Sequence, residues 1–458
     1  MYDLIVIGGG PAGYIAAIRA GQLGKKVACV EVERPGGTCL NWGCIPTKAL
    51  LKNAHVYHQM KHQAEEFGMS FDNLSYDWGK VIKRSRGVAN RLAGGVEFLF
   101  KKNKVDYLKG FGSIEGEGKV GVEKDGKKEV YETKNIIVAT GCKPRELPPL
   151  PFDGKSVLSS KDAMILEKQP KSMLIVGAGA IGVEFAYVYN AFGTEVTLLE
   201  MQPTLLPVED QEVGKALGKS YKKLGVNCLT DTKVTNFQNN GDSVTLTVEN
   251  AKGTQELTAD TCLVAIGVAP VLPGGQTPEL DDRGFVKTDE RYMTNMSNVF
   301  AIGDIDGPPW LAHTGMFEAV QCVDGLFVEG HTPRRVGNFP GCTYCYPEVA
   351  SVGKTEEALK EEGVAYKVGK FPYQALGKAQ AIGETDGFVK LLYGEEHGEL
   401  LGAHIMGENA TDLIAEMGLA LEMELTTDEI HGTIHAHPTI AEAIHEATLD
   451  ADGHALHV

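Results

Sequence analysis

Long apolar runs are missing from this 458-residue sequence. A helix that spans a bilayer needs about 18 or more consecutive apolar residues, and no stretch approaches that length. Room for a targeting peptide is also missing, because the first predicted strand begins at Tyr2. We therefore expect a cytoplasmic protein, of bacterial type, without membrane helices.

Positive charge is scarce as well. Lysine and arginine together number 44 against 61 aspartates and glutamates, which gives a formal charge of −17. Proteins that bind nucleic acid usually present a basic surface to the phosphate backbone, so this balance argues against nucleic acid as a partner. Low-complexity segments are absent too, and the length suffices for about three domains with separate cores.

The cysteines lack the even number and regular spacing of a disulfide framework. There are nine of them, which favours a reducing compartment where most thiols stay unoxidised. Five lie in or near apolar runs and are interpreted as small buried hydrophobes: Cys29, Cys142, Cys228, Cys262 and Cys322.

One cysteine pair has a spacing of its own, because only four residues separate Cys39 from Cys44. Residues five apart on a regular helix lie roughly 7–8 Å apart along its axis, beyond the Cα separation of about 4.4–6.8 Å that a disulfide needs. An irregular turn at Gly43 would bring the thiols into range. A disulfide over so short a loop does little to constrain the unfolded chain, so thiol–disulfide exchange explains the pair better than stapling. Half of a metal site and two ordinary thiols remain alternatives.

A dinucleotide-binding pattern precedes this pair. Apolar residues 3–7 predict a buried parallel strand, followed by glycines at positions 8, 10 and 13, a helical pattern and a second strand ending at Glu31. Such glycines allow a tight turn and a close approach of the backbone to a pyrophosphate at a helix N-terminus. The acid at the end of the second strand accepts hydrogen bonds from a ribose.

The same pattern recurs from residue 173, with glycines at 177, 179 and 182 and a strand ending at Glu200. In both copies the acid lies 23 positions after the first glycine, at 31 after 8 and at 200 after 177. A carboxylate at Glu200 suits a free 2′-hydroxyl and repels a 2′-phosphate, and residues 201–204 contain no arginine or lysine to offset it. The second site is therefore predicted to prefer NAD over NADP.

The other segments give a coarser pattern. Residues 71–100 predict mostly helix, residues 105–131 β hairpins, and residues 135–141, 262–267 and 299–304 buried strands. The proline-rich residues 144–151 fit a linker. From about residue 335 antiparallel strands are predicted at 349–353, 387–393 and 400–406, followed by helices over 409–421 and at the C-terminus. Pro438 suits the first turn of the last helix, which leaves His437 just outside it.

These motifs resemble, in their order along residues 2 to about 457, those of the pyridine nucleotide–disulfide oxidoreductases. The resemblance is carried by the two dinucleotide units, residues 36–48 with both cysteines, residues 301–304, and His437 with Pro438. It implies an α/β fold with two Rossmann-like domains and a C-terminal α+β dimerisation domain that has an antiparallel sheet. The implied boundaries are 1–143 with 268–334 for the FAD domain, 144–267 for the NAD domain and 335–458 for the dimerisation domain.

The resemblance also implies the residues that contact each cofactor. For FAD they are Gly8, Gly10, Gly13, Glu31, Thr38, Lys48, Gly112, Thr140, Gly141, Asp304 and Ala312. For NAD they are Gly177, Gly179, Gly182, Glu200 and Gly267. Glu184 matches a family acid near the flavin and is expected to pair with Lys48.

Catalytic roles follow from the same resemblance. Cys39 would exchange with a dithiol substrate, and Cys44 would lie against the isoalloxazine ring. A thiol of ordinary pKa is mostly protonated at pH 7, so exchange needs a base. Imidazole in general titrates near neutrality, and the resemblance gives this role to His437. Glu442 matches the carboxylate that orients this imidazole. Five residues apart on one helix they would point to different sides, so they can meet only if His437 lies outside the helix.

Within the family, residues 45–48 and Glu200 are most similar to the members that oxidise protein-bound dihydrolipoamide and reduce NAD⁺. This implies a homodimer that serves a 2-oxo acid dehydrogenase or glycine-cleavage complex and meets its lipoyl domains or peripheral-subunit-binding domain, without a metal or a membrane. Glutathione or mercuric reductase activity, and a mainly structural role in a complex, remain alternatives. Residues 449–458 lack the cysteine pair that mercuric reductases carry there.

Two further groups of residues are interpreted as structural. Cys342 and Cys345 depart from the usual family sequence, and a second redox pair or half of a zinc site is disfavoured because strand residues three apart face opposite sides. The remaining C-terminal histidines are expected on the surface or in structural contacts: His431, His435, His445, His454 and His457.

Overall fold

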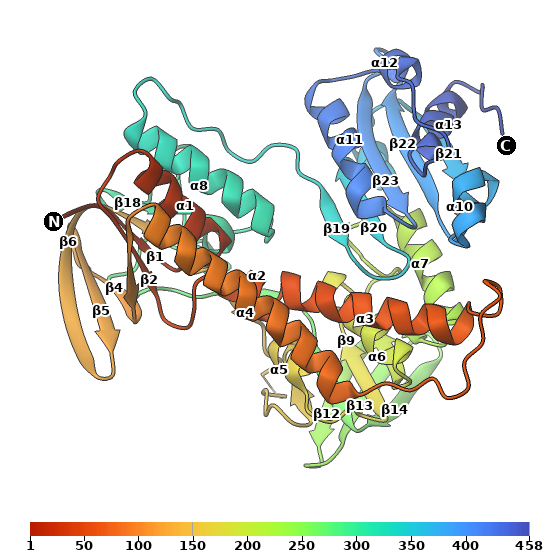
Figure 1. Cartoon of the computed structure of the whole chain (residues 1–458), viewed down its shortest axis with the longest axis horizontal. Helices are drawn as coiled ribbons and strands as arrows, with labels where there is room; N and C mark the ends of the chain where they lie inside the picture. The colour runs from red at the N-terminus through yellow and green to blue at the C-terminus, as the bar shows by residue number, and fades with distance from the viewer. Residues whose placement is uncertain (149, 458) are drawn as a thin grey trace. The chain divides into compact units, whose positions relative to one another are not determined.

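The computed structural model, drawn in Figure 1, describes residues 1–148 and 150–457. By its internal contacts it divides into two compact units. Unit 1 comprises Met1–Ala49, Asp77–Arg145 and Gly267–Gly337. Unit 2 comprises Leu50–Tyr76, Glu146–Ile266 and Asn338–Val458. Within the described ranges no helix is long and apolar enough to cross a membrane.

Unit 1 is built on a parallel sheet with β1 at its centre. β1 pairs with β2 on one side and with β6 on the other, while β3 and β18 extend the sheet beyond them. The last four residues of β1 and all of β2 are buried, because layers cover both faces of the sheet. The bounds are β1 (Tyr2–Ile7), β2 (Val27–Glu31), β3 (Val105–Lys109), β6 (Lys127–Val138) and β18 (Val299–Ala301).

The two faces of this sheet carry different layers. Leu4 and Val6 of β1 pack against helices α1 (Pro11–Gln22) and α8 (Ala312–Phe327), which lie side by side in Figure 1. Ile5 and Ile7 pack on the opposite side, against the antiparallel strands β4 (Phe111–Gly116) and β5 (Lys119–Lys124). The alternation of side chains along a strand therefore divides one apolar run between two cores.

Three segments of unit 1 differ from the sequence-based expectation. The helix predicted from residue 71 begins instead at Trp78, as α4 (Trp78–Lys102), because the Asp77 side chain caps it by accepting from the Lys80 amide at 3.0 Å. β3 pairs parallel with β2 and so is not part of a hairpin. β6 continues from antiparallel pairing with β5 into parallel pairing with β1, so residues 135–138 do not form a separate strand.

Unit 2 contains a second parallel sheet, in the order β11-β10-β9-β15-β8, and helix α6 follows its central strand β9. The predicted repeat of the first strand–loop–helix–strand unit is thereby confirmed. The bounds are β8 (Val157–Leu158), β9 (Ser172–Val176), α6 (Ala180–Ala191), β10 (Glu195–Leu199), β11 (Asn227–Leu229) and β15 (Thr261–Val264). An antiparallel sheet follows, of β12 (Lys233–Asn239), β13 (Val244–Asn250) and β14 (Gly253–Ala259).

The C-terminal part of unit 2 is an antiparallel sheet in the order β19-β20-β23-β22-β21, and α11 and α13 pack on it. The strands predicted in this part are confirmed, with β22 one residue later than expected. The strand bounds are β19 (Gly341–Thr343), β20 (Val349–Gly353), β21 (Tyr366–Pro372), β22 (Phe388–Gly394) and β23 (Leu400–Met406). The helices of this part are α9 (Glu356–Glu362), α10 (Gly377–Ile382), α11 (Ala410–Glu422), α12 (Thr427–Gly432) and α13 (Glu442–Ala451).

The last helix corrects one expectation. The sequence suggested that Pro438 lies in the first turn of the last helix. The helix, α13, instead begins at Glu442, so Pro438 lies ahead of it. Ile440 and Ile444 are both buried in the core beneath the sheet, although only Ile444 belongs to the helix. The buried apolar face at the C-terminus therefore begins in the turn before α13 and continues into the helix.

The division into three domains stays a prediction. Unit 1 contains most of both segments assigned to the FAD domain, and residues 50–76 belong to unit 2. Unit 2 also contains most of the segments assigned to the NAD and dimerisation domains.

Candidate active site

The two cysteines of the short-spaced pair lie on consecutive helices. Cys39 is in α2 (Gly37–Trp42), and Cys44 is the first residue of α3 (Cys44–His62). Gly43 between them has φ −144° and ψ −112°, outside the helical region, which is the irregular turn that the sequence predicts. Both residues are thiols, and a hydrogen bond joins them. The turn therefore brings the two thiols into hydrogen-bonding contact, as exchange between them requires.

The surroundings of Cys39 control its proton. The hydrogen bond to Cys44 and burial both raise the pKa of the Cys39 thiol far above its usual value, while the positive charge of Lys48 acts in the opposite direction. Lys48 lies near the start of α3, the helix that begins at Cys44, and its positive charge acts on Cys39. Release of a thiolate from this pair therefore needs a group that accepts the proton.

Backbone contacts hold α2 against the first glycine-rich loop. The Gly36 amide donates to the Gly9 carbonyl at 2.8 Å. Gly37 adopts φ +54°, and a Cβ there would lie 2.5 Å from the Cα of Gly10. Because only glycine allows this approach, α2 is placed directly on the loop between β1 and α1.

That loop has the geometry of a dinucleotide site. A Cβ at Gly8 would lie 2.2 Å from the Ala139 carbonyl oxygen, and one at Gly13 would lie 1.9 Å from the Gly8 carbonyl oxygen. These glycines therefore pack the loop, the helix and the sheet together. Gly10 is the N-cap of α1, and in the described part of the chain the nearest atom to its Cβ position outside its own neighbours is the Gly37 Cα at 4.0 Å, so the backbone here leaves room for a phosphate to approach.

The acid at the end of β2 is fixed by two backbone amides. Glu31 accepts from the Gly9 amide and from the Glu33 amide, each at 2.8 Å. Burial raises the pKa of Glu31, and these hydrogen bonds act against that effect. A carboxylate has about four acceptor positions, so two remain for the hydroxyls of a ribose.

The residues predicted to bind FAD all belong to unit 1, and one of them has an unmet hydrogen-bonding requirement. The Thr140 hydroxyl is inaccessible to solvent and has no partner within residues 1–148 and 150–457. Gly141, beside it, has φ +67° with open space at its Cβ position. Cys142 donates to the Asp304 carbonyl at 3.3 Å, which joins this turn to the one after β18, and burial raises the pKa of Asp304 to about 6. These features fit a bound FAD.

The other predicted FAD residues lie around the same sheet. Thr38 and Lys48 belong to the redox helices α2 and α3, and Ala312 is the first residue of α8. A Cβ at Gly112 would lie 2.5 Å from Cγ2 of Ile7, so Gly112 lets β4 pack closely on β1. Gly112 therefore has a structural role that needs no contact with the cofactor.

The second glycine-rich loop repeats the first. A Cβ at Gly182 would lie 1.9 Å from the Gly177 carbonyl oxygen, while Gly179 has open space at its Cβ position. Glu200 accepts from the Ala178 amide at 2.8 Å and from the Gln202 amide at 2.9 Å, as Glu31 does in unit 1. The loop in unit 2 therefore fits NAD. Gly267 lies at the start of a segment of unit 1, so it is not in the same unit as the other predicted NAD residues.

The predicted imidazole and carboxylate meet in the turn before α13. His437 Nδ1 lies 2.8 Å from Glu442 Oε1, and the Thr439 amide donates to Glu442 Oε2 at 2.9 Å. This contact is possible because His437 precedes the helix, so the five-residue spacing does not place the two side chains on different sides of it. Burial acts to raise the pKa of Glu442, but the hydrogen bonds from Thr439 and His437 outweigh it and hold that pKa below its usual value. The His437 side chain is 77% exposed, so it can reach another molecule.

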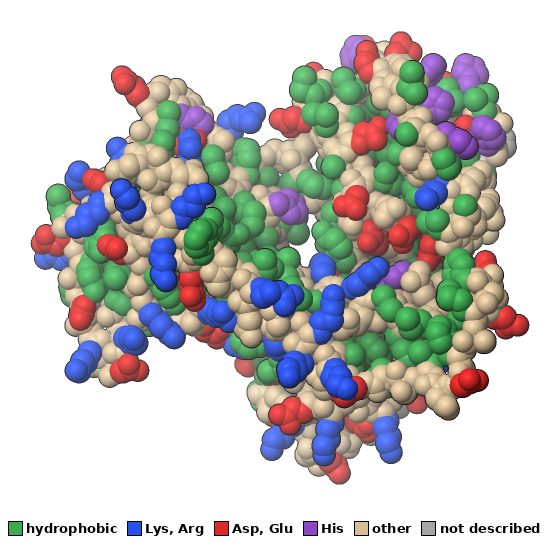
Figure 2. All heavy atoms as spheres, in the orientation of Figure 1, with side chains coloured by type: hydrophobic (Ala, Val, Ile, Leu, Met, Phe, Trp, Pro, Cys, Tyr) green, Lys and Arg blue, Asp and Glu red, His purple; other side chains and the backbone are tan. Residues whose placement is uncertain are grey.

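Other histidines and cysteines have structural contacts. Histidine side chains gather on the part of unit 2 around α12 and α13 (Figure 2), where the His435 ring lies 5.7 Å from that of His445. His435 Nε2 lies 2.9 Å from Glu416, whose hydrogen bond raises the pKa of the imidazole. Cys345 donates to the Pro347 carbonyl at 3.1 Å and lies beyond the end of β19, which contains Cys342. The structural interpretation of these residues fits the contacts.

Glu184, expected to pair with Lys48, is a buried residue of α6 whose Oε1 accepts from the Tyr344 amide at 2.9 Å. Its pairing with Lys48 stays a prediction. The predicted roles of the catalytic and cofactor-binding residues likewise stay predictions.

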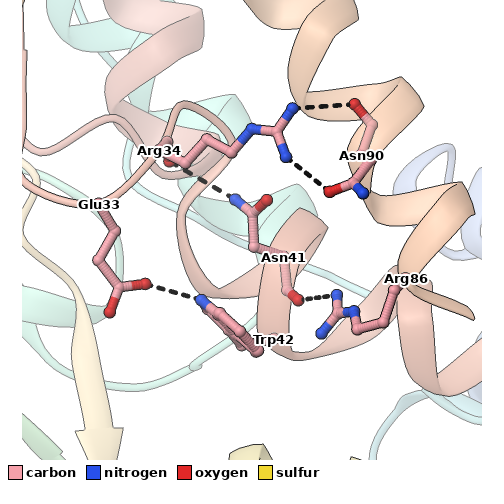
Figure 3. Close-up of a pocket in the computed structure, with 6 residues that line it drawn as sticks. All are labelled: Glu33, Arg34, Asn41, Trp42, Arg86 and Asn90. Atoms are coloured by element: carbon pink, nitrogen blue, oxygen red, sulfur yellow. Dashed lines mark hydrogen bonds between the residues drawn. The ribbon is translucent and has the colours of Figure 1, made fainter. Parts of the chain in front are cut away.

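A pocket of about 470 Å³, which no sequence pattern indicated, lies beside α2 (Figure 3). Trp42, between the two cysteines, donates from Nε1 to Glu33 at 2.7 Å, and the Arg86 guanidinium lies 4.6 Å from the centre of its ring. Arg86 also donates to the Asn41 carbonyl. Arg86 belongs to α4, so these contacts clamp α2 against a helix that is distant in sequence. The only local signal was the large aromatic residue inside the redox motif.

Comparison with known proteins identifies the family. Residues 2–319 match the model of the pyridine nucleotide-disulphide oxidoreductases, and residues 339–448 match the model of their dimerisation domain. A dihydrolipoyl dehydrogenase of Zymomonas mobilis is 44% identical, over 100% of this chain and 99% of its own length. One from Rhizobium etli is 43% identical, over 99% of both chains, and one from Bacillus subtilis is 41% identical, over 100% of this chain and 99% of its own.

Solved structures share the fold. The flavoprotein disulfide reductase RclA of Escherichia coli superposes with a TM-score of 0.84 at 26% identity, covering 97% of this chain and 98% of its own. LpdA of Mycobacterium tuberculosis gives a TM-score of 0.88 over 98% of this chain and 99% of its own, and at 23% identity this likeness concerns the fold alone. The chain forms a homodimer through its dimerisation domain. The chain therefore belongs to the pyridine nucleotide–disulphide oxidoreductase family, as an oxidoreductase whose cofactors are FAD and NAD.

Proposed function

We propose that this enzyme oxidises protein-bound dihydrolipoamide to lipoamide and reduces NAD⁺ to NADH, as a dihydrolipoyl dehydrogenase. The observation that carries the proposal is the hydrogen-bonded pair of Cys39 and Cys44, held on the glycine-rich loop of the FAD site. A dithiol substrate matches a disulfide that opens and closes between two neighbouring thiols. Glu200 at the second site favours NAD as the acceptor.

The thiol chemistry is a pair of exchange steps. With Cys39 and Cys44 joined as a disulfide, one substrate thiolate attacks Cys39 Sγ, the S–S bond breaks, and Cys44 leaves as a thiolate. The second substrate thiolate then attacks the substrate sulfur in the mixed disulfide and releases Cys39 as a thiolate. Two electrons thus move from the substrate to the cysteine pair, and the substrate loses two protons. FAD, when bound, accepts that electron pair and allows it to pass to NAD⁺.

His437 is the proposed base for these steps. With the Nδ1 proton donated to Glu442 Oε1, the lone pair at Nε2 can take a proton from a substrate thiol. The Thr439 amide fixes the other carboxylate oxygen, so the ring keeps its orientation and tautomer. Glu442 acts as a positioning residue because it contacts the base and not the substrate.

Two subunits are proposed to build each site. Cys39 and Cys44 belong to unit 1, whereas the exposed His437 belongs to unit 2, in the segment that matches the dimerisation domain. A two-fold axis would bring the imidazole of one chain to the thiols of the other and form two equal sites. The proposed physiological partners are the lipoyl domains or the peripheral-subunit-binding domain of a 2-oxo acid dehydrogenase or glycine-cleavage complex in the cytoplasm.

The proposed function is tested by steady-state turnover of the FAD-bound dimer. Dihydrolipoamide with NAD⁺ is expected to give a kcat/KM of at least about 10⁴ M⁻¹s⁻¹, within the usual range for enzymes. Glutathione disulfide with NADPH, and mercuric ion with NADPH, should give rates near background. A reductase with preference for either of those pairs would contradict the proposal. Loss of the dihydrolipoamide reaction in Cys44→Ser, with FAD retained, would tie the turnover to this cysteine pair.

Charge at the second dinucleotide site should set the choice of cofactor. In the double variant Glu200→Ala with Met201→Arg, the ratio of kcat/KM for NADP to that for NAD is expected to rise roughly 10–100-fold. The change removes the repulsion of a 2′-phosphate and adds a cation that can pair with it.

The control for this variant is Glu200→Gln, which removes the charge but keeps an acceptor oxygen for the Ala178 or Gln202 amide. It should lose preference for NAD without gaining much activity with NADP. Equal use of both cofactors by the wild type would show that Glu200 does not select NAD.

A further inference from the structure

Unit 2 contains three metal-ligating side chains that the proposed reaction does not use. His55 lies on α3, Glu384 follows α10, and Glu408 follows β23. Each offers one ligand atom, and the three atoms lie within 4.8 Å of one another. No sequence pattern indicates this cluster, because more than 300 residues separate His55 from the other two.

The two carboxylates have few positive charges near them. Burial raises the pKa of both Glu384 and Glu408. The charge of Glu384 raises the pKa of Glu408 further, and the charge of Lys52 acts against this rise. Glu384 is 9% exposed, accepts from the Tyr346 hydroxyl at 2.7 Å, and has Asp386 as a nearby like charge. Two desolvated carboxylates side by side are unfavourable when ionised, and a bound cation would remove that cost.

His55 is prepared to act as a ligand. Burial lowers the pKa of its imidazole to about 4, so at neutral pH the ring is uncharged, which is the form that binds metals. Its ring centre lies 5.0 Å from that of Tyr346, whose hydroxyl holds Glu384. Tyr346 therefore helps to fix the orientation of two of the three ligands.

Buried polar atoms near the cluster give a second, independent indication. The Tyr187 hydroxyl is buried, on a residue that is 2% exposed, and has no hydrogen-bond partner within the described ranges. The Tyr187 ring centre lies 5.5 Å from that of Tyr346. Burial raises the pKa of Tyr187, and the charge of Glu384 adds to this effect. Gln63 Oε1 is likewise buried without a partner in the described chain, while its amide nitrogen donates to the Tyr346 hydroxyl at 3.4 Å. Buried polar groups normally have partners, and water on a bound metal would supply them.

We propose that His55, Glu384 and Glu408 bind a divalent transition metal ion, with zinc as the best match. One imidazole nitrogen and two carboxylate oxygens form a ligand set that zinc accepts, with water in the fourth position. Tetrahedral bonds of about 2.0–2.2 Å place ligand atoms roughly 3.3–3.5 Å apart, so small side-chain movements would close the site from 4.8 Å. The ion would tie α3 to the segments after α10 and β23.

The test measures zinc bound to the FAD-bound dimer after removal of metals with a chelator. Cys39→Ser with Cys44→Ser serves as the background, because thiolates bind zinc themselves. Equilibrium dialysis with elemental analysis should find one more zinc per chain in this background than in the same chain with Glu408→Gln. The affinity should fall at least roughly tenfold in Glu408→Gln and in His55→Phe.

His58 provides the matched control. It lies one turn further along α3, is partly buried, and has its ring centre 5.5 Å from that of Tyr346, but it is not one of the three ligands. His58→Phe should therefore keep the zinc that His55→Phe loses. Flavin content and circular dichroism establish that each variant is folded, and Glu408→Gln, which keeps shape and size, supplies the answer if His55→Phe does not fold. Equal zinc content in the background, His55→Phe and Glu408→Gln would overturn the proposal, as would equal losses in His55→Phe and His58→Phe.

Discussion

Co-expression of Cys44→Ser chains with His437→Gln chains is expected to restore about a quarter of the wild-type rate of dihydrolipoamide oxidation. Each variant alone should lose roughly 10²–10⁴-fold, because Cys44→Ser removes one of the exchanging thiols and His437→Gln removes the base. In a hybrid dimer built as proposed, one site receives both lesions and the other receives neither. Random pairing makes about half of the dimers hybrids with one intact site each.

A second mixture tests whether the thiols and the base of a site come from different subunits or from one chain. Chains with both changes are mixed with wild-type chains, and differently tagged chains allow the hybrids to be counted. If thiols and base come from different subunits, only wild-type dimers work, at about a quarter of full activity. If they come from one chain, about half of the activity remains, and the first mixture gives none. That pair of results would exclude the shared site.

Lys390→Met is expected to destabilise unit 2 by about 3–5 kcal/mol. Lys390 is 1% exposed, and its Nζ lies 3.0 Å from both carboxylate oxygens of Asp210 and 2.6 Å from Glu356. Asp210 is the N-cap of α7 (Gln211–Lys223) and is fully buried, so the variant leaves a buried charge without its cation. Urea unfolding followed by circular dichroism measures the loss.

Two controls separate charge from packing in this experiment. Removing the partners as well, with Asp210→Asn and Glu356→Gln, should recover part of the stability that Lys390→Met loses, because no buried charge is then left alone. Lys287→Met removes an ion pair with Glu279 that is about half exposed on both sides, and should cost far less than Lys390→Met, because solvent screens such a pair. Equal losses in Lys390→Met and Lys287→Met would contradict the importance of the buried network.

The pH dependence follows from the same contacts. Burial alone would raise the pKa of Glu356, but hydrogen bonds from Lys360 and Lys390 lower it from 4.5 to about 2, and Lys390 also lowers that of Asp210. A carboxylate with a lowered pKa contributes stability above its unfolded value and loses it as the pH falls through the folded value. The wild type should therefore lose this contribution between pH 4.5 and about 2, and Lys390→Met should lose less over that range.

The sequence by itself determined the parts of the protein whose geometry is local. The loop after β1 needs glycine at position 8, where φ is +107°, and at position 13, where a Cβ would strike the Gly8 carbonyl oxygen, so the spacing alone predicts the strand, the turn and the helix. The same holds for the second loop with Glu200, and for the turn at Gly43 that brings Cys39 to Cys44. These features follow from backbone sterics within one segment, which residue types and spacing record directly.

Only the tertiary structure decided which distant segments meet. Periodicity showed a helix near the C-terminus, but its start at Glu442, which lets His437 meet that carboxylate, depends on how the preceding turn packs into the core. The clamp of Arg86 on Trp42 and the approach of His55 to Glu384 likewise join residues far apart in the chain. A pattern within one segment shows which face will be buried, whereas the identity of the covering segment depends on the free energy of packing the whole unit.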